Sequence, residues 1–348
     1  MSYYYEFELG KAAKILCEDL FKLKRGETFI ITADTESDRR VVDATARAAF
    51  ACDAKPMVIY TASPLDVAKA ADPMLPVESL TAALLKADAW AELNNECLLF
   101  STPYTIAMKG NKKLRHLCLP GMNVGMMVRN IGRVDYPNLE NFLKLVTKKT
   151  LSAKHMRITT PAGTDVEFNN EPGRKVNMRV GYADTPGSHM MAGQIGLCPN
   201  FESINGTIVF DGSVSPLGLL KESIRLTIKK GEIVKIEGGK GKEAIEYEKW
   251  LKSFNHPQMF KLAHMCYGFN PGARLTGDIL EDERVWGATE WGLGHVGPIY
   301  VPGGIPGPSH SDGICLNSSV WLDGVQIMNN GQLLDPELIK LAEKLGKY

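Results

Sequence analysis

The sequence has no surplus of charge of either sign, since 40 basic residues balance 40 acidic ones in a chain of 348 residues. This balance gives no support to a nucleic-acid-binding surface or to an anionic membrane partner. Apolar runs fall far short of the ~20 residues that cross a bilayer, and the first residues lack a basic region followed by an apolar core. We therefore expect a cytoplasmic protein without a nucleic-acid or membrane partner.

Cysteines at metal-binding spacing are missing as well. The seven cysteines are scattered and never spaced as Cys-x-x-Cys, which argues against a disulfide framework and against a structural zinc cluster. We expect reduced, mostly buried thiols. The N-terminal domain also has no recognisable glycine-rich nucleotide loop of the Gly-x-Gly-x-x-Gly or Gly-x4-Gly-Lys type. The N-terminal part is therefore expected to serve assembly and pocket closure rather than nucleotide binding.

Residues 1–150 alternate between helix-like and strand-like segments. Short apolar runs at 28–33 and 56–60 predict two buried strands, and the segment between them predicts a helix from about Ser37. The expected apolar face of this helix consists of Val42, Ala46, Ala49 and Phe50. The alternation predicts an open α/β domain with a largely parallel sheet.

Hairpin signatures dominate after residue 150. Segment 156–160 turns at 161–164, and segment 224–228 turns into 233–236. Helical segments are expected at 241–254 and 336–345. The predicted fold is therefore α/β, with an N-terminal domain at 1–150 and a mixed α+β, metal-binding catalytic domain at 151–348.

His310 and Asp312 carry the clearest chemical signal. Only Ser311 separates them, and alternate residues of an extended segment point the same way, so one imidazole and one carboxylate can hold one cation. The preceding segment, 292–309, holds six glycines and four prolines. Such a segment predicts a loop, neither helix nor central strand, that could close over the cation as a lid. A hydrogen-bonded turn pair is the alternative.

Five of the seven histidines follow residue 188, which places the chemistry in the second domain. His264 lies in an apolar segment that ends in turn-forming residues. If it converges with His310 and Asp312, two imidazoles and a carboxylate occupy one face of an ion, the arrangement typical of non-haem Fe(II) oxygenases. A hydrogen-bonded core histidine is the alternative for His264.

Several short motifs occur in an order that resembles a known superfamily. They are Pro199-Asn200-Phe201-Glu202, Gly206-Thr207-Ile208-Val209-Phe210-Asp211, Gly268-Phe269-Asn270, Asp282-Glu283-Arg284 with Gly287, and Ser309-His310-Ser311-Asp312. This series resembles the thermophilic metallo-aminopeptidases typified by aminopeptidase T. The segments at 181–187 and around His264 more closely resemble 2,5-dihydroxypyridine 5,6-dioxygenases. Together the motifs cover most of residues 155–325.

The two branches imply different metal centres. The peptidase branch implies a centre with two metals. In the peptidases, its ligands are glutamates at the positions of Glu202 and His264, a histidine at the position of Glu290, and the pair that matches His310 and Asp312. Here an imidazole replaces one bridging carboxylate, which lowers the negative charge that could hold two divalent ions together. The dioxygenase branch implies one Fe(II) held by the residues matching His264, His310 and Asp312.

The resemblance also implies roles outside the ligand set. His189 matches a substrate-pocket histidine and is expected to act as general base or hydrogen-bond donor, although an exposed loop histidine is an equal alternative. A second pocket histidine of the relatives matches Phe100 here. Glu202 and Glu290 are expected either to orient a ligand or to bind a second metal. Relatives form dimers or higher oligomers, so a homo-oligomer is expected.

The sequence thus predicts a non-haem, extradiol-like dioxygenase. It would use Fe(II) to cleave a small hydroxylated N-heterocycle or aromatic acid similar to 2,5-dihydroxypyridine. The alternative is a metallo-aminopeptidase or other metallo-hydrolase with one or two Zn, Mn or Co ions. A binding protein without turnover is the third alternative.

Overall fold

The computed structural model describes residues 5–347. The chain forms two compact units: unit 1 contains Met1–Val134 and Arg179–Ala192, and unit 2 contains Asp135–Met178 and Gly193–Tyr348. The expected boundary at residue 150 falls inside helix α6 (Tyr136–Ser152). Within the described residues, no helix is both long and apolar enough to span a bilayer.

Unit 1 is built on a five-stranded sheet in the order β2-β1-β3-β4-β8. Its strands are β1 (Thr28–Asp34), β2 (Lys55–Thr61), β3 (Ala89–Glu92), β4 (Arg115–Cys118) and β8 (Gly187–Met190). Every neighbouring pair is parallel. The predicted α/β fold with a parallel sheet is confirmed.

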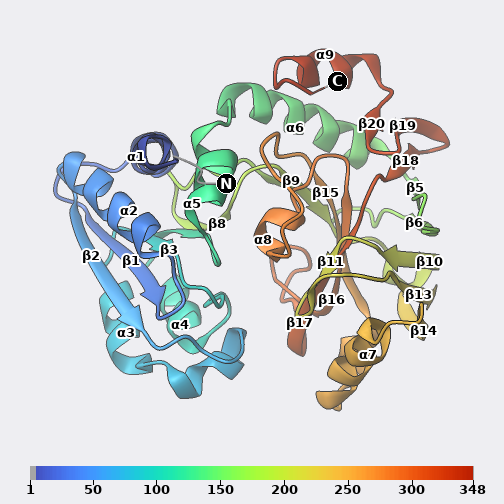
Figure 1. Ribbon diagram of the computed structural model, residues 1–348, viewed down its shortest axis with the longest axis horizontal. Coiled ribbons are helices and arrows are strands. Elements are labelled where there is room, and N and C mark those ends of the chain that lie inside the picture. The colour runs from blue at the N-terminus through green and yellow to red at the C-terminus, as the bar shows by residue number, and fades with distance from the viewer. Residues whose placement is uncertain (1–4, 348) are drawn as a thin grey trace. The chain divides into compact units, whose positions relative to one another are not determined.

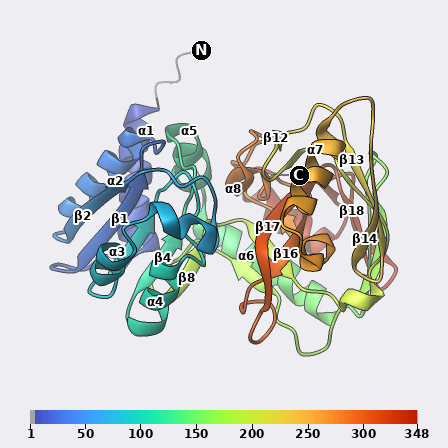
Figure 2. The same cartoon turned by 90° about the horizontal axis from the view of Figure 1, so that it is seen from below.

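Helices cover both faces of this sheet, with α1, α2 and α5 on one face and α3 and α4 on the other (Figure 1, Figure 2). The helical segments are α1 (Glu6–Lys14), η1 (Ile15–Leu20), α2 (Arg39–Ala51), η2 (Ala68–Met74), α3 (Val77–Leu84), α4 (Thr102–Gly110), α5 (Val124–Met127) and η3 (Val128–Gly132). Covering helices bury the central strands, which explains the continuous apolar runs of the sequence.

Two details of the unit 1 prediction are wrong. Phe50 is 73% exposed, because the buried stripe of α2 runs through Val42, Thr45 and Ala49 and the next residue lies outside it. Strand β2 is not buried but is the edge of the sheet, and Tyr60 on it is 46% exposed. An apolar run alone does not distinguish an edge strand from a central one.

Unit 2 contains two sheets. The eight-stranded sheet has the order β14-β13-β10-β6-β5-β18-β19-β20, and the seven-stranded sheet has the order β12-β11-β17-β16-β15-β9-β7. The strands of the first sheet are β5 (His155–Thr159), β6 (Asp165–Asn169), β10 (Asn205–Phe210), β13 (Ile224–Lys229), β14 (Glu232–Gly238), β18 (Ser319–Leu322), β19 (Val325–Asn329) and β20 (Gln332–Leu333). Both predicted hairpins, β5–β6 and β13–β14, are confirmed.

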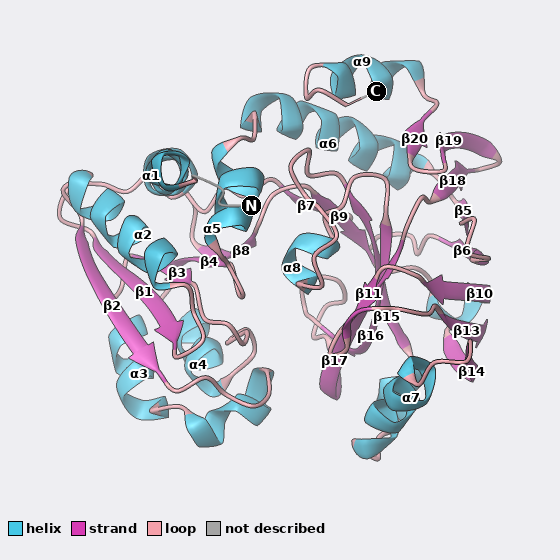
Figure 3. Ribbon diagram, viewed as in Figure 1, coloured by secondary structure: helices cyan, strands magenta, loops and turns pink. Residues whose placement is uncertain are grey.

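The seven-stranded sheet carries the residues of chemical interest. Its strands are β7 (Asn177–Arg179), β9 (Gln194–Leu197), β11 (Ser213–Val214), β12 (Gly218–Leu219), β15 (Leu262–Gly268), β16 (Thr289–Val296) and β17 (Ile305–Cys315). The helical segments of unit 2 are α6, η4 (Phe201–Ser203), α7 (Glu243–Ser253), η5 (Pro257–Phe260), α8 (Ile279–Asp282) and α9 (Pro336–Glu343). Helices α6 and α9 lie side by side, and α7 packs on β14 (Figure 3).

The predicted loop at 292–309 is wrong, because most of it forms the central hairpin β16–β17. Only residues 297–304 connect the two strands. The prolines are tolerated because β17 meets its second neighbour β11 only at Gly313, so Pro306 and Pro308 lie where the strand is paired on one side. The glycines leave room for neighbouring side chains, as Gly292 does for the ring of His264.

Candidate metal centre

His264, His310 and Asp312 converge on one face of the seven-stranded sheet. His264 lies on β15, and the two others lie on β17, with β16 between them. The register pairs Gly292 with both His264 and Asp312. Because Gly292 has no side chain, the imidazole and the carboxylate can meet above it. A Cβ at this position would lie 2.6 Å from the His264 ring, which explains the glycine in a central strand.

The three facing ligand atoms form a small triangle. His264 Nε2 lies 3.2 Å from His310 Nε2, and Asp312 Oδ1 lies 3.0 Å from His310 Nε2 and 3.6 Å from His264 Nε2. Ligand atoms about 2.1 Å from an ion and at right angles to one another would be about 3.0 Å apart. The two edges that meet at His310 therefore fit one face of an octahedral metal site, and the third edge is wider.

Hydrogen bonds orient the His310 ring and strand β17. His310 Nδ1 donates to the carbonyl oxygen of His295 at 2.8 Å, which leaves the Nε2 lone pair for a metal. Ser311 points to the opposite face, where its Oγ donates to the Ser215 carbonyl oxygen at 2.6 Å and accepts from the Tyr247 hydroxyl at 2.9 Å. The alternation along β17 thus separates the candidate ligands from the residues that anchor the strand.

Glu290 supports His264 from the side away from the triangle. Its Oε1 lies 3.2 Å from His264 Nδ1, and Cys266 Sγ lies 3.7 Å from the same nitrogen. Glu290 is fully buried, and Gln194 donates to its Oε2 at 3.3 Å. His264, Cys266 and Glu290 also form a group that could hold a metal by proximity alone.

The charges within this centre are strongly coupled. Burial, together with the negative charge of Asp312, raises the pKa of Glu290 well above its ordinary value. Burial lowers the pKa of His310, but attraction and hydrogen bonding to Asp312 outweigh it and raise that pKa to about 9. Burial opposes ionisation of Asp312, yet the neighbouring His310 charge lowers its pKa. Without a metal, the centre therefore holds an ionised Asp312 beside a neutral Glu290.

The other predicted residues lie elsewhere. His189 is on β8 of unit 1, where Nε2 donates to the Thr185 carbonyl oxygen at 2.9 Å, so Nδ1 is the free base position. Burial lowers the pKa of His189. Glu202 is exposed in η4 and belongs to none of the ligand groups found among residues 5–347. Phe100, which the resemblance matches to a second pocket histidine, lies in unit 1.

Tyr300 is part of the centre and was missed by sequence reasoning. Its ring centroid lies 4.8 Å from that of His264, and its hydroxyl lies 3.6 Å from Cys266 Sγ. The residue sits in the connection between β16 and β17, whose glycine and proline content gave no signal for a buried aromatic ring. Tyr300 therefore forms an aromatic wall against the candidate ligand His264.

Comparison with known proteins gives a consistent family match. The family model described as 2,5-dihydroxypyridine 5,6-dioxygenase matches residues 16–335. A curated protein of the same name from Pseudomonas putida KT2440 is 29% identical over 216 residues, which are 58% of this chain and 61% of that protein. The aligned part thus spans about three fifths of this relative's length.

Solved structures share the fold. The 2,5-dihydroxypyridine dioxygenase from Pseudomonas putida KT2440 superposes with a TM-score of 0.77 at 20% identity, covering 96% of this chain and 99% of that chain. AmpT from Thermus thermophilus superposes with a TM-score of 0.67 at 15% identity, covering 95% and 100%. The fold resemblance expected from the ordered motifs is confirmed.

Proposed function

Because the chain belongs to the 2,5-dihydroxypyridine 5,6-dioxygenase family, we propose that it is a non-haem, Fe(II)-dependent ring-cleaving dioxygenase. Its substrate would be a small hydroxylated N-heterocycle or aromatic acid similar to 2,5-dihydroxypyridine. The observation that carries the proposal is the triangle of His264 Nε2, His310 Nε2 and Asp312 Oδ1, with edges of 3.0 to 3.6 Å. Cytoplasmic location and homo-oligomeric assembly stay predictions.

The donor set favours iron. Two neutral imidazoles and one carboxylate on a single face leave about three coordination positions open, as in the 2-His-1-carboxylate oxygenases. When bound, Fe(II) would hold substrate and dioxygen together and let electron density pass from the ring to oxygen. The protein's share is to hold His310 in the required tautomer through the His295 carbonyl oxygen, while Glu290 Oε1 lies 3.2 Å from His264 Nδ1.

His189 would supply the base. A substrate hydroxyl must lose its proton before the ring becomes electron-rich, and a neutral imidazole can accept that proton. The Nε2 bond to the Thr185 carbonyl oxygen fixes the tautomer with Nδ1 unprotonated. The lowered pKa of His189 keeps the ring neutral near pH 7.

A metallo-hydrolase with one or two Zn, Mn or Co ions is the second candidate, because Glu290 and Cys266 lie beside His264 as further donors. This reading needs Glu290 as an ionised ligand. Its buried surroundings and the nearby Asp312 charge favour the neutral acid instead. Glu202, the other carboxylate of the two-metal pattern, is exposed in η4. Both features support the single-iron centre.

Metal content and two activity assays test the proposal. Anaerobically purified protein should retain about one iron per chain and should consume oxygen with 2,5-dihydroxypyridine. It should not release amine from an aminoacyl anilide. Two zinc or manganese ions with anilide cleavage would instead establish the hydrolase, and inactivity of the iron-loaded protein in both assays would indicate a binding protein.

A further inference from the structure

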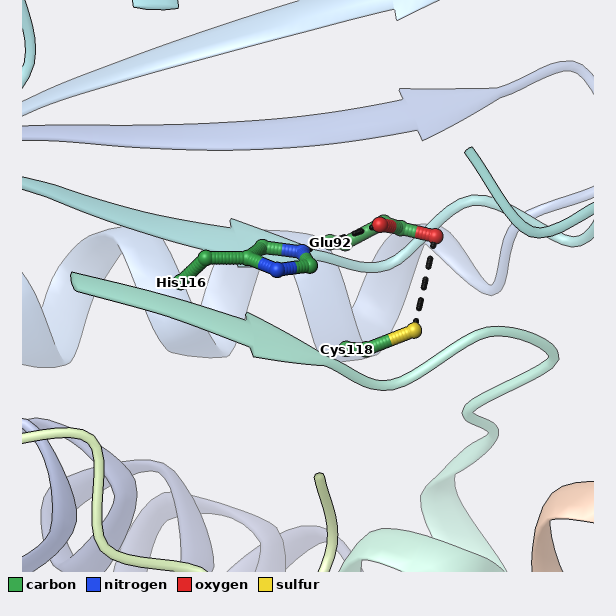
Figure 4. Close-up of side chains that lie close together, drawn as sticks. All are labelled: Glu92, His116 and Cys118. Carbon is green, nitrogen blue, oxygen red and sulfur yellow. Dashed lines mark hydrogen bonds and ion pairs between the residues drawn. The ribbon is translucent and has the colours of Figure 1, made fainter. Parts of the chain in front are cut away.

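A second group of metal-binding side chains lies in unit 1, at the carboxyl ends of two neighbouring parallel strands. Glu92 ends β3, and His116 and Cys118 lie on β4 (Figure 4). All three residues are fully buried. Cys97, from the loop that follows β3, adds a fourth donor, because its Sγ lies 3.5 Å from Cys118 Sγ.

Three distances between these donors lie near those of a tetrahedral site. His116 Nε2 lies 2.9 Å from Glu92 Oε2, and Cys118 Sγ lies 3.7 Å from Glu92 Oε1. Donors bound tetrahedrally to zinc are about 3.8 Å apart for two sulfurs and about 3.3 Å apart for nitrogen and oxygen. The sulfur pair and the nitrogen–oxygen pair are thus already within a few tenths of an ångström of the required distances.

We propose that Glu92, Cys97, His116 and Cys118 form a closed binding site for one zinc ion in unit 1. Thiolate and imidazole ligands in a tetrahedral arrangement select zinc over the oxygen-preferring cations. On binding, each thiol loses its proton to solvent, so two protons leave while Glu92 binds as carboxylate and His116 as neutral imidazole. No electron transfer is involved.

The groups around the donors suit this role. Ser188 Oγ lies 2.9 Å from His116 Nδ1, which leaves Nε2 to face Glu92 and the ion. The Trp90 ring lies against the same imidazole, with centroids 4.1 Å apart, and the Tyr104 ring contacts it at 5.5 Å. These rings and the complete burial of Glu92, His116 and Cys118 keep water from the cluster, which strengthens the binding of a charged ion by charged ligands.

The consequence of binding would be structural. Four protein ligands leave no open position for a substrate. Cys97 belongs to the connection between β3 and α4, and this connection is already tied to β3 by the Leu98 amide, which donates to Glu92 Oε1 at 2.7 Å. An ion bound by Cys97 and Cys118 would fix the same connection to β4 as well.

Cobalt titration of the metal-free, reduced full-length chain tests the site. Tetrahedral Co²⁺ with thiolate ligands shows intense near-ultraviolet charge-transfer absorption, which an oxygen and nitrogen site lacks. We expect this absorption to saturate at about one Co²⁺ per chain and to be displaced by Zn²⁺. Cys97→Ser and Cys118→Ser should each abolish the charge-transfer band at that stoichiometry, and each should weaken zinc binding by at least about a hundredfold.

Cys266→Ser is the matched control, because Cys266 is the thiol near His264 in unit 2. The band should survive in this variant. If it disappears there and persists in Cys97→Ser, or if the wild-type chain shows no thiolate band, the proposal is overturned. A Cys97–Cys118 disulfide in freshly purified protein, detected as five free thiols out of seven, would overturn it too.

Ser188→Ala gives a milder test that does not remove a ligand and so keeps the fold intact. Losing the partner of His116 Nδ1 should weaken zinc binding by about 10- to 100-fold. Ser152→Ala is the control, since Ser152 Oγ binds only a backbone carbonyl oxygen at the exposed end of α6. Equal zinc affinity in the two variants would contradict the assigned role of Ser188.

Discussion

The donor clusters of the two units differ in residue type and in exposure: unit 2 offers two histidines and an aspartate, whereas unit 1 offers a glutamate, a histidine and two cysteines. In unit 2, the three facing donors come from β15 and β17 and meet above Gly292 of the intervening strand β16. The side chains of Asp312 and His310 are 18% and 29% exposed. In unit 1, three of the four donors are fully buried and cross no intervening strand. An open triangle leaves room for reactants, whereas a closed tetrahedron only holds an ion. On the two proposals, the metal of unit 2 would take part in the reaction, and the metal of unit 1 would stabilise the fold.

Asp312→Ala should give the largest effect. Removing the only carboxylate of the triangle leaves two imidazoles that cannot hold iron tightly, so activity should fall by at least about a thousandfold. Iron content after gel filtration and oxygen uptake measure the loss. Zinc binding in unit 1 should remain, which sharpens the contrast between the clusters. Asp165→Ala, which removes only an exposed ion pair with Arg157, is the control.

His189→Ala should lower turnover by about a hundredfold while iron stays bound, because the residue acts as a base and not as a ligand. Burial lowers the pKa of His189 below its ordinary value of 6.5. The ring is therefore unprotonated at neutral pH, and wild-type activity should fall only as the pH drops below that value. This acid limb of kcat/KM should vanish in the variant. His155→Ala, at a half-exposed residue, is the control and should keep the acid limb. An acid limb that is the same in both variants would remove His189 from the mechanism.

Gly292→Ala should disrupt the unit 2 cluster although it replaces none of the three candidate ligands. The new methyl group would lie 2.6 Å from His264 ring atoms, so the ring must move away from His310 and Asp312. We expect iron affinity to fall about 10- to 100-fold, as for other changes that misorient a ligand. Gly10→Ala is the matched control, because no atom lies within 4 Å of a Cβ placed there. Equal iron affinity in both variants would show that the ring does not depend on Gly292.

Glu290→Gln should give the smallest effect and separates the two proposed functions. A neutral Glu290 and a glutamine are both uncharged and of similar size, so iron binding and ring cleavage should change by less than about tenfold. If Glu290 were an ionised ligand of a hydrolase, the same change would abolish activity. Metal content and both activity assays distinguish these outcomes.

The fold was largely readable from local patterns. Helix and strand periods identified the parallel sheet of unit 1 and the hairpins β5–β6 and β13–β14, because each depends on residues close in sequence. Edge position and strand order depend on packing between distant segments, and β2 was accordingly misjudged. The glycines of β16 looked like loop residues, since nothing local shows that a histidine from β15 needs the space above Gly292.

The candidate site was predictable only in part for the same reason. His310 and Asp312 share a face of β17 because alternation is local. Their approach to His264 was suggested by a resemblance and not by spacing. The sequence predicts scattered, buried thiols at Cys97 and Cys118, because the two residues lie 21 positions apart. The parallel pairing of β3 with β4 brings Glu92 beside Cys118, and the loop after β3 brings Cys97 to the same place.

The central claim is that three side chains of unit 2 hold one iron. A crystal structure of the Fe(II)-loaded protein, grown without oxygen and measured at the iron absorption edge, tests it most directly. We expect one anomalous peak in unit 2, about 2.0 to 2.4 Å from His264 Nε2, His310 Nε2 and Asp312 Oδ1. Two peaks bridged by Glu290, or a single peak away from these three atoms, would contradict the account.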